Sequence, residues 1–217
     1  MTGSRVDTTP ASTWVWVAIA LAMAATSVIV NLGGRADAAL TSSWTPALDW
    51  QPALARAEPW RAWTAVFVHY SDLHLAANLA GSVGVAAWGW VARVPARTVV
   101  AWVIAWPLVQ WGLLMQPELQ HYGGLSGMLH AGIAAAAVHL IFAGTRTQRR
   151  IGGAVLVGLV VKLLTESPWA GEISHPASWD IAVAPGAHVS GVLVGAVVAA
   201  LAEVLHRTTS THAPVGG

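Results

Sequence analysis

The chain has 217 residues, of which 55% are hydrophobic and only 10% are charged, and its formal net charge is +1. A soluble domain with so little charged surface would be hard to keep in solution, so the composition predicts a polytopic membrane protein. The absence of cysteine excludes disulfides, thiolate metal sites and a thiol nucleophile. The few basic residues are scattered, which argues against a nucleic-acid partner.

Six apolar segments are long enough, or nearly so, to cross the bilayer as helices. The predicted spans cover residues 14–32, 73–92, 98–115, 125–143, 151–165 and 182–205. We therefore expect an all-α fold, with a membrane domain over residues 14–205. It would lie between an N-terminal tail of residues 1–13 and a C-terminal tail of residues 206–217.

The arginines predict how these spans are oriented. Most of them fall in segments that would share one side of the membrane, namely Arg5, Arg93, Arg97, Arg146, Arg149, Arg150 and Arg207. The opposite side has only Arg35, Arg56 and Arg61, all in one long loop. By the positive-inside rule both termini are expected to be cytoplasmic, and that long loop faces outward.

Given this topology, four polar residues would lie at a similar depth near the outer surface. Ser126 and His188 each lie near the start of a span that enters from an outer loop, as do His74 and Asn78 of a third span. Ionisable residues within the membrane are costly and are often functional. The pattern predicts a compact polar site that opens to external water.

Each residue type in this set has a chemical reason to be there. A serine hydroxyl is a weak nucleophile until a base accepts its proton, and a neutral histidine is the usual base near pH 7. We therefore expect Ser126 as nucleophile and His188 as general base. His74 and Asn78, four residues apart on one helix face, would stabilise an oxyanion together with the backbone N–H of Ser126.

Less specific interpretations exist for the same residues. Serine in a membrane helix usually bonds its own backbone, and Gly-Leu-Ser-Gly is a weak signal in a chain rich in alanine and glycine. The helices that carry the two residues must also approach closely. Small residues at four-residue spacing allow such an approach in lipid, and here they include Gly127, Ala131, Gly191 and Gly195.

Four motifs, in this order, resemble those of the rhomboid intramembrane serine proteases. They are Glu58-x-Trp60-Arg61, His74-x-x-x-Asn78, Gly124-x-Ser126-Gly127 and Ala187-His188-x-x-Gly191-x-x-x-Gly195. The resemblance covers residues 58–200. It implies a six-helix rhomboid-like bundle, a Ser–His dyad without an aspartate, and cleavage of a substrate helix near its outer end, with Gly124 and Gly127 supporting the nucleophile.

The segment from Gly124 to His130 resembles one branch of that family, the rhombosortases. Typical bacterial rhomboids have a tyrosine four residues after the serine, where this chain has His130. The resemblance implies a bacterial inner-membrane enzyme that needs no cofactor and no metal. Its partners would be transmembrane substrates with a C-terminal apolar helix, and it would remove a sorting tail that contains a Gly-Gly motif.

Three further sites are left with two interpretations each. His130 either supports His188 in place of the tyrosine, or is a packed histidine bonded to a neighbouring helix. Lys162 and Glu166 form either part of a gate or substrate groove, or an ordinary interfacial ion pair. His69 either positions substrate or water, or is a solvated interfacial histidine. Two residues of an outer loop, His121 and Tyr122, are expected to line the entrance.

Two other functions compete with proteolysis. Nine histidines in a small bundle raise the alternative of a haem-binding membrane protein, although His139 and His206 are expected near the cytoplasmic side, away from the outer cluster. The second alternative is a catalytically inactive rhomboid-like scaffold. Fluorophosphonate labelling and a Soret band distinguish these functions.

Overall fold

The computed structural model describes residues 10–38, 44–116 and 118–211, and within them the chain is helical. The long helices are α1 (Ala11–Ala38), α4 (Asp72–Ala92), α5 (Ala96–Gly112), α6 (Ser126–Ala143), α7 (Arg146–Thr165) and α8 (Pro185–Thr211). The short ones are α2 (Thr45–Leu48), α3 (Arg61–Thr64) and the 3₁₀ turns η1 (Pro52–Leu54), η2 (Ala65–Phe67) and η3 (Leu113–Met115). The β-pairing in the described residues consists of two isolated antiparallel bridges.

Five of these helices are long and apolar enough to cross a membrane. By length and composition the candidate spans are Ala11–Gly34, Asp72–Ala92, Ala96–Met115, Ser126–Ala143 and Pro185–Thr209. They agree with the predicted all-helical, multi-pass membrane protein. α7 coincides with the remaining predicted span, but it begins with a basic stretch and contains Lys162, which lower its hydropathy.

The outermost helices are longer than the predicted spans. α1 starts at Ala11, inside the predicted tail, because the hydroxyls of Ser12 and Thr13 donate to the carbonyl of Val94 and anchor this end. α8 continues to Thr211, well past residue 205. Residues 1–9 and 212–217 of the two predicted tails lie outside the described residues.

α8 also begins later than predicted, at Pro185 instead of residue 182. The fixed φ of proline suits the first turn of a helix, where its missing N–H costs no hydrogen bond. The residues just before it are extended, since Val183 pairs with Ser174 in an antiparallel bridge. His188 therefore lies in the first turn of its helix.

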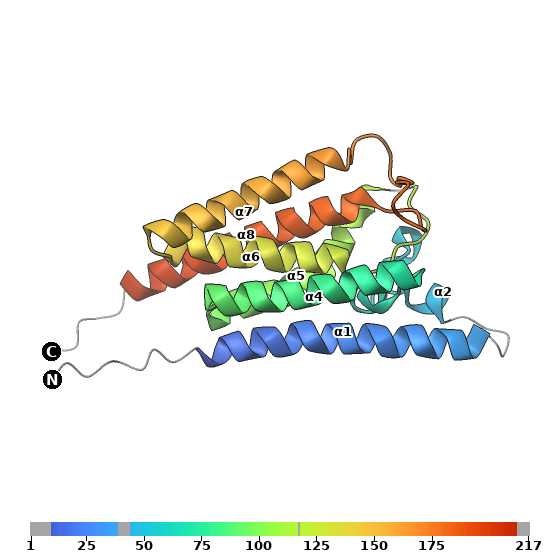
Figure 1. The fold of residues 1–217 in the computed structure, drawn as a ribbon, viewed down its shortest axis with the longest axis horizontal. Helices are drawn as coiled ribbons and strands as arrows, with labels where there is room; N and C mark the ends of the chain where they lie inside the picture. Colours follow the sequence, from blue (N-terminus) through green and yellow to red (C-terminus); the bar gives the residue numbers. More distant parts are fainter. Residues whose placement is uncertain (1–9, 39–43, 117, 212–217) are drawn as a thin grey trace.

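The centre of the bundle is α6, which packs against α4, α5, α7 and α8 (Figure 1). Twelve of its 18 residues are buried, so nearly every face of this helix is in contact with protein. α1 packs on α4 at one side of the molecule, and α7 lies at the opposite side. Because α6 is enclosed, the residue at its first position is held by several helices at once.

The contact between α6 and α8 is close enough to bring backbone against backbone. A Cβ added at Gly191 or Gly195 would collide with the carbonyl oxygen of Gly127 or Ala131, respectively. A Cβ at Gly127 would lie 3.0 Å from the carbonyl oxygen of Ala187. The small residues noted in the sequence thus lie at the helix contact, as their spacing predicted.

A buried arginine organises the long loop between α1 and α4. One guanidinium nitrogen of Arg61 donates to the carbonyl oxygens of Pro46 and Asp49, both at 2.8 Å, and the same guanidinium pairs with the carboxylates of Asp49 and Glu58. A buried charge is tolerated only with such partners. Backbone pairing of Trp50 with Tyr122 then joins this loop to the segment that precedes α6.

A second buried charge cluster lies at the opposite end of the bundle. Glu203 of α8 is only 2% exposed and accepts a hydrogen bond from Nδ1 of His139 of α6 at 2.8 Å. Arg97 of α5 lies 3.0 Å from the same carboxylate. These contacts tie α5, α6 and α8 together at the end where α8 finishes.

We predict that Gly195→Ala lowers the free energy of unfolding by about 1–3 kcal/mol, because the added methyl group has to push α8 away from the Ala131 backbone. Thermal unfolding in detergent micelles measures the change. The control is Gly158→Ala on α7, where a Cβ meets nothing within 4 Å and stability should stay equal or rise. Equal destabilisation of both variants would contradict the packing argument.

Candidate active site

The structure brings the two residues expected to carry the chemistry into hydrogen-bond contact. Ser126 is the first residue of α6, and its Oγ lies 2.9 Å from Nε2 of His188 in the first turn of α8. The contact forms because both helices begin at the same end of the bundle (Figure 1) and approach closely along their small residues. This distance is the one that proton transfer from a serine hydroxyl requires.

The other ring nitrogen of His188 is also bonded, to Glu166, which the sequence had predicted only as a partner of Lys162. Nδ1 lies 2.6 Å from Oε2 of Glu166, at the C-terminal end of α7. An ionised carboxylate only accepts hydrogen bonds, so Nδ1 carries the proton and Nε2 is free to accept the one on Ser126. The family resemblance implied a Ser–His dyad with no aspartate, whereas here Ser126, His188 and Glu166 form a chain of three side chains.

The predicted pair of Lys162 and Glu166 is present as well. The lysine ammonium contacts Oε1 of the same carboxylate whose Oε2 faces His188. Partial burial acts to raise the pKa of Glu166, but the hydrogen bonds with His188 and Lys162 outweigh it and lower the pKa to about 2. Glu166 is therefore ionised at neutral pH.

His130 contacts both members of the central hydrogen bond. Its ring stacks on that of His188, with centroids 4.4 Å apart and planes 19° apart. Its Nδ1 lies 2.6 Å from the carbonyl oxygen of Ser126, one turn earlier on the same helix, and donates to it. The ring contact is the one expected for a residue that supports His188, and the hydrogen bond is within α6 instead of to a neighbouring helix.

His74 and Asn78 of α4 face the segment that leads into Ser126. Gly124 has a φ of +124°, which favours glycine, and a Cβ there would lie only 2.6 Å from Nε2 of His74 and 3.8 Å from Nδ2 of Asn78. The Gly124 backbone thus lies directly against the His74 ring and near the side-chain amide of Asn78, which also donates to the carbonyl of His74 at 3.0 Å. The N–H of Ser126, at the start of α6, has no carbonyl partner within its own helix.

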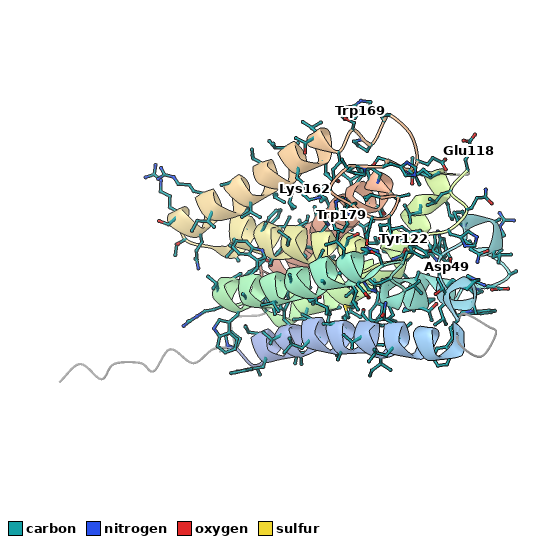
Figure 2. All side chains as sticks on the ribbon, turned by 45° about the vertical axis from the view of Figure 1, so that its right-hand side comes forward. Asp49, Glu118, Tyr122, Lys162, Trp169 and Trp179 are labelled. Atoms are coloured by element: carbon teal, nitrogen blue, oxygen red, sulfur yellow. The ribbon has the colours of Figure 1, made fainter. Side chains whose placement is uncertain are left out.

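These residues line a cavity of about 1500 Å³. The helices that contribute Ser126 and His188 to it begin at the end of the bundle away from the start of α1 (Figure 1). Its wall includes Ser126, His188, His74, Asn78, His130, Glu166 and Lys162. His121 and Tyr122 also line it. Figure 2 shows the labelled Trp179 and Tyr122 near this end, and Trp179 packs edge-on to the ring of His74.

His69 differs from the solvated histidine considered in the sequence analysis. It is only 8% exposed, its Nδ1 donates to the carbonyl of Phe67 at 3.1 Å, and its ring lies 4.8 Å from that of His74. Burial lowers the pKa of His69 to about 4, so this histidine is neutral at pH 7. The contact supports His74 from outside the cavity wall.

Among the described residues, no group of three or more His, Asp or Glu side chains is arranged as a metal site. In a comparison with known proteins, no family model and no curated protein matches the chain. The geometry joins a serine hydroxyl, a histidine, a carboxylate and a set of hydrogen-bond donors around one cavity. That combination suits attack on a carbonyl carbon.

The burial of His69 predicts a specific pH dependence of stability. Its pKa is about 4 when folded and near 6.5 when unfolded, so the unfolded state binds more protons between these values. The free energy of unfolding should therefore fall as the pH drops through this window, by up to about 3 kcal/mol from this residue.

Chemical unfolding in detergent at about pH 7 and about pH 4.5 measures this effect. His69→Gln should show a weaker loss of stability than the wild type, because groups other than His69 contribute equally to both proteins. The exposed His175 provides the control, and His175→Gln should behave as the wild type. An unchanged slope in His69→Gln would contradict the prediction.

Proposed function

We propose that the protein is an intramembrane serine endopeptidase of the rhomboid type, and that it cleaves transmembrane substrates near their outer end. The observation that carries the proposal is the 2.9 Å contact between Ser126 Oγ and His188 Nε2 beside a cavity at one end of an apolar bundle. An inactive scaffold would not need this hydrogen bond, and both His130 and His188 are bonded to protein groups through Nδ1.

In the proposed reaction, Ser126 Oγ attacks the carbonyl carbon of the scissile peptide while its proton passes to Nε2 of His188. The oxygen of the tetrahedral intermediate accepts hydrogen bonds from His74, Asn78 and the backbone N–H of Ser126. His188 then gives its proton to the leaving amine. Water, activated by the same nitrogen, hydrolyses the acyl-enzyme and restores the serine hydroxyl.

The proposed topology has six spans, with α7 as the fifth. Its apolar part, between Arg150 and Lys162, is short, so the basic residues at each end would lie near the headgroups. The turns between α4 and α5 and between α6 and α7 lie at the same end of the bundle as the C-terminal end of α8. In or near these three places lie six of the ten arginines, namely Arg93, Arg97, Arg146, Arg149, Arg150 and Arg207. We assign this end to the cytoplasm, so that the cavity opens to the periplasmic side of a bacterial inner membrane.

The proposed substrates are exported proteins with a C-terminal tail that contains a Gly-Gly motif and an apolar helix. Two features support this choice. The Gly124–His130 segment resembles the rhombosortase branch, and His130 stacks on His188 where that branch differs from typical rhomboids. The apolar residues Leu129, Ile133 and Leu159 also line the cavity, which suits an apolar segment.

A fluorophosphonate probe, which reacts with activated serines, tests the proposal. The purified protein in micelles should be labelled on Ser126, and the label should disappear in both Ser126→Ala and His188→Ala. Ser27→Ala is the control, since this buried serine only bonds its own helix. Equal labelling of the wild type and Ser126→Ala, or no labelling of the wild type, would contradict the assignment.

The stacking of His130 predicts a graded effect of substitution. His130→Tyr keeps an aromatic ring against His188 but removes the bond to the Ser126 carbonyl, and it should slow labelling by about tenfold. His130→Ala removes both contacts and should slow it further. Labelling rates at a fixed probe concentration measure the series, and a wild-type rate in His130→Ala would show that the ring has no role.

A further inference from the structure

We propose that Glu166 is a positioning residue that fixes the tautomer and orientation of His188, which makes the site a Ser126–His188–Glu166 triad. The inference rests on the proposed function, because it assigns a part in that reaction. It departs from the dyad that the sequence motifs imply. The carboxylate comes from α7, a third helix that contributes neither the nucleophile nor the base.

The geometry has the features that a triad requires. Nδ1 and Nε2 of one imidazole face a carboxylate oxygen at 2.6 Å and a serine oxygen at 2.9 Å. The His188 side chain is 9% exposed and that of Glu166 is 24% exposed, so the hydrogen bond between them is sheltered from bulk water. In such an arrangement the carboxylate holds the base in the tautomer that can accept the serine proton.

During the reaction the carboxylate would not take a proton itself. When Nε2 accepts the proton from Ser126, the imidazole becomes a cation with both nitrogens protonated. Glu166 then continues to accept the hydrogen bond from Nδ1, and its negative charge stabilises that cation. The proton on Nε2 leaves with the amine product, so the protonation state of Glu166 is the same before and after each step.

A carboxylate at the position of Glu166 does not stabilise α7, so helix stability does not explain why the residue is there. The residue caps the C-terminus of α7, where the helix dipole disfavours a negative charge. Its partner Lys162 precedes it by four residues, which is the weaker orientation for a stabilising ion pair on a helix. The next residue, Ser167, has a φ of +49°, so the chain leaves the helix in a conformation that is uncommon for a residue other than glycine.

Lys162 pairs with the second oxygen of the Glu166 carboxylate. It contacts Oε1 and leaves Oε2 to His188, so the two partners do not compete for one oxygen. A lysine next to the carboxylate favours its ionised form, which is the form that accepts the proton from Nδ1. The pair described in the sequence analysis therefore acts on the site through Glu166.

The test compares Glu166→Gln with the wild type in two measurements. In cleavage of a peptide or protein substrate, kcat should fall by about 10²- to 10⁴-fold while KM changes little, because the amide no longer fixes the tautomer of the base. In ¹⁵N spectra of histidine-labelled protein, His188 should have a protonated Nδ1 and an unprotonated Nε2 in the wild type. Glu166→Gln should show a mixture of tautomers, and His188→Phe identifies the signals.

Two further variants distinguish a positioning role of Glu166 from a general effect of charge in the cavity. Glu172→Gln removes a different carboxylate of the same cavity, and it should leave the His188 tautomer unchanged. Lys162→Met removes the ion pair but keeps the contact between Glu166 and His188, so it should keep the tautomer and lower kcat less than Glu166→Gln does. A loss of kcat in Lys162→Met as large as that in Glu166→Gln would overturn the assignment.

The proposed function and the triad can fail separately. If Ser126→Ala abolishes cleavage but Glu166→Gln keeps both wild-type kcat and the wild-type tautomer, the triad is wrong and the protease stands. If the wild type neither cleaves nor labels, the protease is wrong. The ¹⁵N tautomer then still reports whether Glu166 orients His188, because this measurement needs no substrate.

Discussion

The site depends on how closely α6 and α8 approach one another. Their backbones meet at Gly127, Gly191 and Gly195, where any side chain would collide with a carbonyl oxygen or come within 3.0 Å of one. In lipid the hydrophobic effect does not drive helices together, so this close packing has to supply much of the contact energy. It also sets the separation of the two helix starts and therefore the hydrogen bond between Ser126 and His188.

The same packing places His130 in contact with both Ser126 and His188. His130 lies one turn into α6, bonds the Ser126 carbonyl and stacks on the ring that bonds the Ser126 hydroxyl. His188 is thereby held on one face by an aromatic ring and at Nδ1 by Glu166. A base fixed on both sides loses little entropy when it accepts a proton, which is the usual reason for supporting a catalytic residue with a second set of contacts.

Charged clusters occupy the two ends of the apolar bundle. Arg61 organises the long loop between α1 and α4 through Asp49 and Glu58, and Glu203 joins three helices at the other end. Within an apolar bundle such groups are tolerated only when each charge has a partner, so they fix particular helix contacts instead of adding general stability. The candidate site thus lies in a bundle that charged contacts hold at both ends and that is tightly packed in the middle.

The sequence by itself determined that the fold is all-helical with several apolar helices. It also determined that Ser126, His188, His74 and Asn78 lie near the starts of three of them, because hydropathy and charge indicate where each apolar helix begins. Only the tertiary structure decided that Glu166 reaches His188 and that His69 is buried. The contact of Glu166 depends on the rotation of α7, and the burial of His69 depends on the path of the loop before α4. Both result from packing between segments that are distant in the sequence. The hydropathy of each segment predicts where its helix begins and ends. How the helices pack decides which side chains from different helices come into contact.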